Sequence, residues 1–164
     1  MVVDLSTNSA LGGFAQGDTP VSVENVVATP YADTLIGDSA SNTLYGWFGV
    51  DALTGNGSND IFVWRSIFDS GNNVGQRDTV SDFYRVHGDL LDFSGIDADG
   101  NAGNGDTAFQ FIGTAAFSAV GQLRYSFEGG GTVIEINTAG ATGSEMQVLL
   151  TNGSTTLIAT DFLL

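Results

Sequence analysis

A nine-residue period runs through the middle of this chain and constrains its fold more than any other feature. Four consecutive segments, 28–36, 37–45, 46–54 and 55–63, align without a gap. The sixth position is always aspartate or asparagine and the eighth is always large and apolar: Asp33, Asn42, Asp51 and Asp60, then Leu35, Leu44, Leu53 and Phe62. A repeat of this length provides one turn and one short strand, and such a unit cannot bury its apolar face alone. The period therefore predicts stacked short strands around a column of inward-pointing apolar side chains.

The sixth-position side chains are the candidate metal ligands. If two nonapeptides complete one coil, residues 18 apart stack, which pairs Asp33 with Asp51 and Asn42 with Asp60. Each pair places two side-chain oxygens near one gap between turns, and loop carbonyls would complete the roughly six to eight oxygens that calcium accepts. Glycines in the loops allow backbone angles that turn those carbonyls toward an ion: Gly37, Gly46, Gly49, Gly55 and Gly57. Counting on in nines reaches Asp69 and Asp78, which could extend the ligand column or simply cap turns.

The charge of the chain agrees with cation binding. Nineteen acidic residues stand against four arginines, there is no lysine, and the net charge is −15. This charge argues against nucleic acid and anionic membrane surfaces as partners, and it predicts self-repulsion unless cations neutralise it. Without cysteine, neither disulfides nor thiolate metal sites contribute. The alternative is an acidic surface that binds no metal.

The remainder of the chain has an all-β pattern. Helix signals are scarce, Gly occurs 23 times, and short apolar runs alternate with turn residues. We expect residues 1–27 to contain strands at 2–5 and 21–27 and to cap the coil. Residues 28–63 form the repeats, and residues 64–164 form an antiparallel β-sandwich packed on the end of the coil. Its expected strands are 78–83, 90–93, 108–112, 122–127, 132–136, 146–150 and 156–158.

The N-terminal sequence has no basic region followed by an apolar run, so no cleaved leader is expected. No stretch approaches the length of a membrane helix, and no membrane insertion is expected.

These features resemble the C-terminal region of RTX proteins, in particular that of serralysin-type secreted metalloproteases. The resemblance rests on the nonapeptides and on five further segments that match the family pattern: 78–83, 89–96, 111–117, 121–125 and 161–164. It implies a parallel β-roll with calcium in its turns, followed by a β-sandwich. It also implies type I secretion to the extracellular space, read from an uncleaved signal at residues 161–164.

The repeats depart from the family pattern at several positions. Asp38, Trp47 and Asn56 stand where a second glycine is usual, and Ala40 and Ser58 replace the fourth-position glycine. Asn42 supplies a neutral oxygen. An alternative is therefore a degenerate coil held by its apolar column, with one site empty.

A protease activity is not expected from these residues. The zinc motif HExxH needs two histidines, and the chain contains only His87. No nucleophile-elbow signature accompanies this histidine, so it is interpreted as part of a surface turn.

The sequence thus favours a non-catalytic calcium-binding module that folds on calcium binding after secretion. Its expected partners are calcium ions and the type I secretion machinery, with self-association or a larger parent enzyme as further possibilities. Two other functions stay open. One is a calcium-dependent structural or adhesive protein of a surface layer or matrix. The other is a glycan-binding module of a secreted enzyme, with four candidate stacking residues: Trp47, Phe48, Trp64 and Tyr84.

Overall fold

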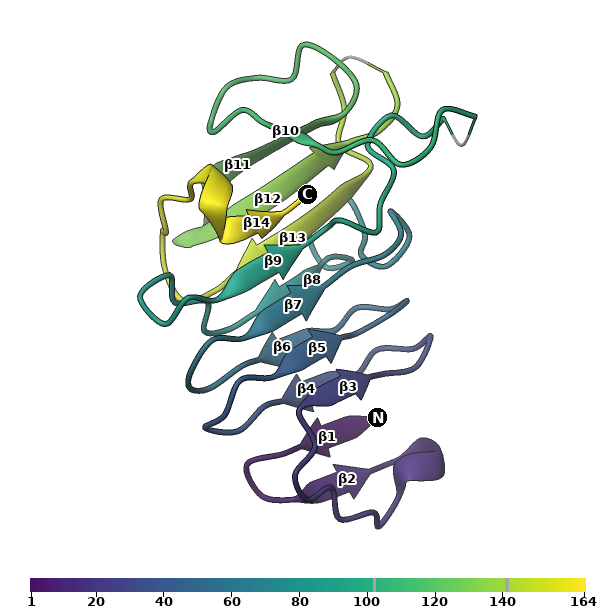
Figure 1. Ribbon diagram of the computed structural model, residues 1–164, viewed down its shortest axis with the longest axis vertical. Coiled ribbons are helices and arrows are strands. Elements are labelled where there is room, and N and C mark those ends of the chain that lie inside the picture. The colour runs from purple at the N-terminus through teal and green to yellow at the C-terminus, as the bar shows by residue number, and fades with distance from the viewer. Residues whose placement is uncertain (102, 141) are drawn as a thin grey trace.

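The computed structural model describes residues 1–101, 103–140 and 142–164, and its centre is a two-sided coil of parallel strands (Figure 1). Each nonapeptide contributes one strand of three residues: β4 (Thr34–Ile36), β5 (Thr43–Tyr45), β6 (Ala52–Thr54) and β7 (Ile61–Val63). Leu35 lies opposite Leu53, and Leu44 lies opposite Phe62. Residues 18 apart therefore stack in parallel register, as the period predicts.

Successive strands alternate between two sheets. A nine-stranded sheet has the order β10-β11-β12-β13-β8-β6-β4-β1-β2, and a five-stranded sheet has the order β14-β9-β7-β5-β3. Facing strands of the two sheets enclose the apolar column. Its six members, at most 1% exposed, are Leu35, Leu44, Leu53, Phe62, Val80 and Leu91. Full burial of such a side chain contributes about 1.5–3 kcal/mol, so this column is the main source of stability in the coil.

The parallel stacking continues beyond the last nonapeptide. Strand β8 (Asp78–Val80) pairs with β6, and β9 (Leu90–Asp92) pairs with β7. Here the stacked residues are 27 and 29 apart, Leu53 with Val80 and Phe62 with Leu91, because longer loops precede both strands. Neither sheet is interrupted between residues 63 and 64, so the coil runs directly into the C-terminal part of the chain.

Residues 1–27 add strands to the N-terminal end of the coil. Strand β1 (Val2–Asp4) lies parallel to β4, and β3 (Asn25–Val27) lies parallel to β5. The strand expected over 21–27 is confined to its last three residues. Strand β2 (Ser9–Leu11), which the sequence analysis missed, pairs antiparallel with β1 and is followed by the 3-10 turn η1 (Gly13–Ala15).

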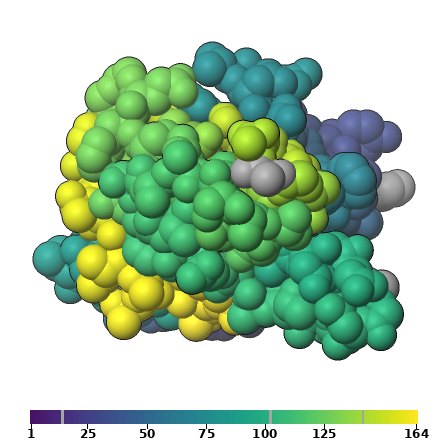
Figure 2. Space-filling model, turned by 90° about the horizontal axis from the view of Figure 1, so that it is seen from above, coloured from purple at the N-terminus to yellow at the C-terminus, as the bar shows by residue number. Residues whose placement is uncertain are grey.

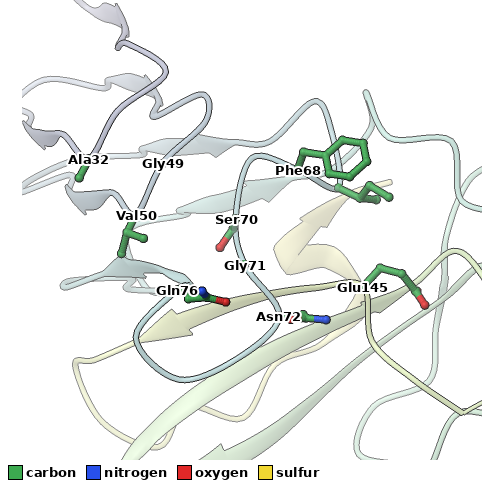
Figure 3. A pocket seen from close by; sticks show the side chains of 10 residues that line it. Ala32, Gly49, Val50, Phe68, Ser70, Gly71, Asn72, Gln76 and Glu145 are labelled. Atoms are coloured by element: carbon green, nitrogen blue, oxygen red, sulfur yellow. The ribbon is translucent and has the colours of Figure 1, made fainter.

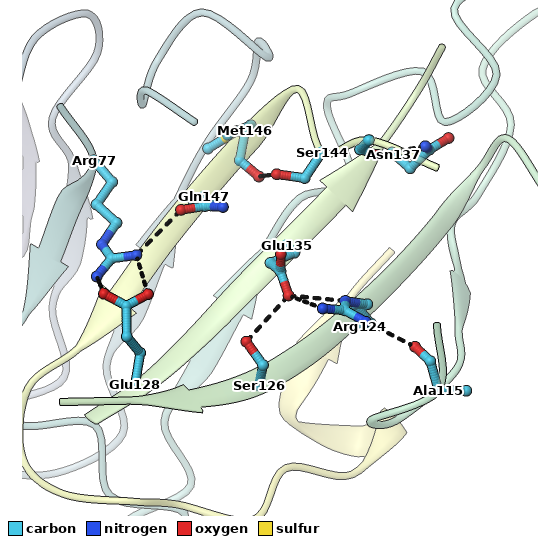
Figure 4. Close-up of polar contacts among 11 residues, drawn as sticks. Arg77, Ala115, Arg124, Ser126, Glu128, Glu135, Asn137, Ser144, Met146 and Gln147 are labelled. Carbon is cyan, nitrogen blue, oxygen red and sulfur yellow. Dashed lines mark hydrogen bonds and ion pairs between the residues drawn. The ribbon is translucent and has the colours of Figure 1, made fainter. Parts of the chain in front are cut away.

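An antiparallel meander extends the nine-stranded sheet at the other end. It consists of β11 (Gln122–Glu128), β12 (Gly131–Asn137) and β13 (Met146–Leu150), and β13 continues parallel onto β8. Short β10 (Gln110–Phe111) pairs with β11. The ion pair of Arg124 with Glu135 joins β11 to β12 (Figure 4). A second ion pair joins Arg77, directly before β8, to Glu128 at the end of β11.

The last residues return to the five-stranded sheet. The 3-10 turn η2 (Ala159–Asp161) leads into β14 (Phe162–Leu163), which lies parallel to β9. Residues 156–158 form no strand, contrary to expectation, although the Leu157 side chain is buried. Viewed from this end, the segments between β9 and β11 and the last residues form much of the surface (Figure 2). Among the described residues, no helix has the length and apolarity to cross a bilayer.

Candidate metal centre in the loops of the roll

The loops of the roll lie along two edges. The first loop edge comprises segments 28–33, 46–51 and 64–77, which lead from the five-stranded to the nine-stranded sheet. The second loop edge comprises segments 37–42, 55–60 and 81–89, which lead in the opposite direction. Because successive nonapeptides alternate between the edges, the sixth-position residues separate into two columns.

Carboxylates form a ladder on the first loop edge. The Asp33 amide N–H donates to Asp51 Oδ1 at 2.8 Å, and the Asp51 amide N–H donates to Asp78 Oδ1 at 2.8 Å. Asp33 itself accepts from the Thr29 amide at 2.7 Å and contacts the Met1 amino group. Each aspartate thus stabilises the backbone of the turn below it, and Asp78 takes the next place after Asp51.

The second loop edge repeats this arrangement. The Asn42 amide N–H donates to Asp60 Oδ1 at 2.8 Å, and the Asp60 amide N–H donates to Asp89 Oδ1 at 3.0 Å. Asp89 was missed as a site residue because the inserted loop shifts it off the nine-residue count. An aspartate followed two residues later by a buried apolar residue, as in Asp51 and Leu53, recurs in Asp89 and Leu91, and that pattern could have identified it.

The first-position glycines are needed for close packing, which corrects part of the sequence interpretation. A Cβ at Gly46 or Gly55 would overlap the Asp51 or Asp60 carboxylate, and one at Gly37 would overlap Asn42 Oδ1. Neither these three glycines nor Gly57 has a positive φ.

Within residues 28–63, positive φ angles occur instead at Gly49 and at three residues of other types. Gly49 has φ 143°, and it packs against the Tyr31 backbone. The other three stand at positions where the family pattern has glycine: Trp47, Asn56 and Ser58. The loops therefore keep a glycine-type conformation at these positions without glycine.

Burial makes the ladder electrostatically unfavourable. Asp51 is 1% exposed, and its Oδ2 has no hydrogen-bond partner in the described part of the chain. Burial, reinforced by the charge of Asp78, raises the Asp51 pKa to about 8. Burial likewise raises the pKa of Asp78 to about 7 and that of Asp60 to about 6. A bound cation would favour the ionised forms of these groups.

Asp69 lies beside the ladder without joining it. Its Oδ2 accepts from the amides of Arg65 and Ser66 at 2.7 and 3.0 Å, which caps a turn of the long first-edge loop. Burial raises the pKa of Asp69. Burial of Tyr45, together with the charge of nearby Asp69, raises the pKa of Tyr45 to about 12. Asp78 is therefore part of the carboxylate ladder and Asp69 is not, although both follow Asp60 at intervals of nine residues.

The donor set suits a hard cation that takes few side-chain ligands. No three His, Cys, Asp or Glu side chains converge on a possible metal position within residues 1–101, 103–140 and 142–164. An ion between turns would therefore need backbone carbonyls as well as carboxylates, a combination that calcium accepts. The unpartnered, buried Asp51 Oδ2 fits such a ligand. These residues fit calcium, with the loops supplying the remaining oxygens.

The aromatic residues considered from the sequence as glycan-stacking candidates differ in their burial. Trp64 is 1% exposed, stacks on Phe93 with ring centroids 5.0 Å apart, and donates from Nε1 to Asp78 at 2.8 Å. It packs in the core and cannot stack on a glycan. The Tyr84 and His87 rings have centroids 5.2 Å apart on the second loop edge, whereas Trp47 and Phe48 stack on each other on the first.

Comparisons with known proteins give a family match and a partial likeness to a solved structure. No curated protein sequence matches the chain. A solved structure that resembles it is the solution structure of the AlgE6R3 subunit from the Azotobacter vinelandii mannuronan C5-epimerase. The sequence identity is 22%, the match covers 85% of this chain and 76% of that one, and the TM-score is 0.36.

The family described as "Peptidase M10 serralysin C terminal" matches residues 4–164. This match supports a calcium-binding repeat module, and proteins of this family are secreted. The family describes the C-terminal region of serralysin and not its protease region. The chain belongs to the peptidase M10 serralysin C-terminal family.

Proposed function

We propose that this domain is a non-catalytic module that binds calcium between successive turns of the roll and folds on calcium binding after type I secretion. The observation that carries the proposal is Asp51, a buried carboxylate that lies between two others and has one oxygen without a partner among the described residues. Ionisation of Asp51 without a cation is costly because burial and the neighbouring charges oppose it.

Four gaps between stacked ligands are the candidate calcium sites. On the first loop edge they are Asp33/Asp51 and Asp51/Asp78, and on the second they are Asn42/Asp60 and Asp60/Asp89. In each gap the protein would supply side-chain oxygens and loop carbonyls, and calcium would supply the positive charge that cancels carboxylate repulsion. The glycines at 37, 46 and 55 let the ligand side chains fold back over their own loops.

Calcium binding then makes folding depend on whether the chain is inside or outside the cell. Metal binding to a site that exists only in the folded chain stabilises that chain by mass action. Where calcium is scarce, the uncompensated carboxylates favour the open chain, and where calcium is abundant they become ligands. An acidic roll of this kind stays unfolded during export and folds outside the cell.

A calcium titration followed by far-UV circular dichroism and thermal melting tests the proposal, with magnesium as the control ion. We expect calcium alone to increase β structure and the Tm cooperatively. Asp51→Ala and Asp60→Ala should each shift the calcium midpoint upward, while Asp106→Ala, at an exposed residue, should not. A chain that melts identically with and without calcium would contradict the proposal.

The C-terminal residues support the export step. Asp161 is 5% exposed, and its carboxylate accepts from Arg85 Nε at 2.8 Å and from the Ile158 amide at 2.7 Å. Phe162 is buried and pairs with Leu91 in the five-stranded sheet. Asp161 and Phe162 are thus buried in the folded chain, and an exporter that reads residues 161–164 in full needs the unfolded chain.

Secretion from a host carrying a type I exporter tests this step. Deletion of residues 161–164 should leave the protein in the cells. Arg85→Ala is the matched control, because it removes the ion pair with Asp161 but leaves the terminal sequence intact, and it should still reach the medium. Equal secretion of the deletion variant and the full chain would exclude a signal in these four residues.

A further inference from the structure

Exposed aromatic and apolar side chains gather on one loop edge of the roll. All three loops of the first edge contribute to this surface, which we call the aromatic face: Tyr31, Trp47, Phe48, Val50, Phe68 and Val74. The two repeat loops of the second edge carry Asp, Ser, Ala, Asn and Gly instead, and exposed large apolar side chains occur on that edge at Tyr84 and Val86 of the longer third loop. Calcium binding does not require this asymmetry, because both edges supply the same ligand positions.

Trp47 is held in an unfavourable backbone conformation. It has φ 66°, a left-handed angle that costs energy for a residue with a large side chain, at a position where the family pattern has glycine. Its ring is 39% exposed and stacks on Phe48, with centroids 5.5 Å apart and planes at 28°. A strained residue that presents a flat aromatic surface to solvent indicates a binding role, since glycine would stabilise the turn better.

A cavity of about 570 Å³ lies beside the first loop edge, and two residues of the aromatic face, Val50 and Phe68, line it (Figure 3). Val50 and Phe68 form apolar parts of its wall, and Asn72, Gln76 and Glu145 line it with polar groups. Gly49 joins the first two loops closely, because its Cα packs on the Tyr31 backbone and leaves no room for a Cβ. The wall is therefore continuous from one turn of the roll to the next.

The polar side of the cavity is held in place by the neighbouring sheet. The Gln147 amide N–H donates to the Gly71 carbonyl at 2.9 Å, and Ser70 Oγ donates to the Gln147 carbonyl at 2.6 Å. Glu145 Oε2 accepts from the Thr138 amide at 2.8 Å. These bonds tie the long first-edge loop to β13, so the cavity is formed before any ligand arrives.

We propose that the aromatic face and this cavity bind a neutral oligosaccharide. Aromatic rings stack on the C–H faces of sugar rings, and carboxamide and carboxylate groups exchange hydrogen bonds with hydroxyls. The net charge of −15 disfavours an acidic polysaccharide, and it equally disfavours a second copy of this chain. The surface thus combines flat apolar rings with the amides of Asn72 and Gln76 and the carboxylate of Glu145, groups that suit recognition of neutral sugar hydroxyls.

Binding of cellohexaose and mannohexaose to the calcium-loaded chain tests the proposal, with a hexamer of polygalacturonate as the anionic comparison. Isothermal titration should show binding of a neutral hexamer and weaker or no binding of the anionic one. Trp47→Gly should weaken neutral binding about tenfold or more. The same substitution should keep or raise the Tm, because it restores a residue suited to φ 66°. A merely structural Trp47 would give a lower Tm.

Phe68→Ala provides a second variant, since Phe68 is 75% exposed and its loss should not affect folding. Tyr84→Ala on the second loop edge is the matched control and should bind as the unmodified chain does. Failure of both neutral hexamers to bind, or full affinity in both Trp47→Gly and Phe68→Ala, would overturn the proposal. Calcium-dependent dimerisation that Trp47→Gly abolishes would also overturn it, by assigning the face to a second copy.

Discussion

The two loop edges of the roll are built from the same repeat but differ in how they satisfy their polar groups. On the first edge, Asp33, Asp51 and Asp78 are stacked carboxylates, and Asp51 Oδ2 has no partner among the described residues. On the second edge, neutral Asn42 replaces one carboxylate, and the side-chain amide of Asn56 donates from Nδ2 to the Gly37 carbonyl at 2.7 Å.

Asp82 adds to this difference. Its two carboxylate oxygens accept from the Gly55 and Asn56 amides at 2.8 and 2.6 Å, which satisfies the second-edge loop with protein groups. The first-edge column thus contains three carboxylates, whereas Asn42 leaves the second-edge column with two, Asp60 and Asp89. The second edge also gains the Asn56 and Asp82 hydrogen bonds, although the buried Asn42 Nδ2 lacks a partner among the described residues. Because consecutive nonapeptides alternate between edges, substitutions in every second repeat change one edge alone.

The largest expected difference is in the response to calcium. Asp51 borders two gaps, and a site loaded at about 100 times its Kd adds about 2.7 kcal/mol, so Asp51→Asn should remove about 5 kcal/mol of calcium-dependent stability. Asp60→Asn should remove about half as much, because Asn56 already occupies a carbonyl in one of its gaps. Urea unfolding with and without calcium measures both. Equal losses would remove the distinction between the edges.

The pH dependence of the stability of the calcium-free chain should also distinguish Asp51 from Asp60. The folded-state pKa values of Asp51, Asp78 and Asp60, about 8, 7 and 6, lie above the value of about 3.9 for an unfolded aspartate. A raised carboxyl pKa means that the folded chain binds more protons, so stability is lost as the pH rises through these values.

We therefore expect the free energy of unfolding without calcium to fall between pH 5 and 8. Asp51→Asn should flatten the upper part of this range and Asp60→Asn the lower part. Saturating calcium should abolish the decline, because the bound ion favours the ionised carboxylates. Stability that increases with pH in the calcium-free chain would contradict the assignment of these groups.

A smaller effect is expected on the second edge from Asn56→Gly. Asn56 has φ 72°, an angle that asparagine tolerates, so Asn56→Gly should change stability by less than about 1 kcal/mol. The substitution also frees the Gly37 carbonyl, so native mass spectrometry should detect one more bound calcium ion. Ser58→Gly is the matched control, because it relieves φ 75° without freeing that carbonyl. An unchanged ion count in Asn56→Gly would show that the amide does not displace a ligand.

The smallest effect is expected at Asp69. Asp69→Asn keeps an oxygen that can accept from the Arg65 and Ser66 amides, so it should change stability by less than about 1 kcal/mol. The number of calcium ions should not change. Asp78→Asn is the comparison, and it should weaken the first-edge response. Loss of an ion in Asp69→Asn would place Asp69 among the ligands.

The repeat region was predictable in detail because its information is local. The eighth-position residues form the buried column, the 18-residue stacking sets the register, and the sixth-position residues form the ladders. Each of these depends only on the nine-residue period and on the burial of apolar side chains. The same reasoning failed at Asp89, where an inserted loop breaks the count. It also failed at residues 156–158, which form no strand although Leu157 is buried.

The sequence by itself therefore determined the all-β class, the direction and spacing of the stacked strands, and which oxygens line the loops. Tertiary structure decided what those residues experience. The Asp51 pKa depends on burial beneath neighbouring turns, the glycine requirement at Gly46 depends on a carboxylate folded over it, and the Trp47 and Trp64 rings differ in exposure only through packing. The nine-residue repeat predicts the direction in which each side chain points. The burial of that side chain and its contacts are set only when the turns pack together.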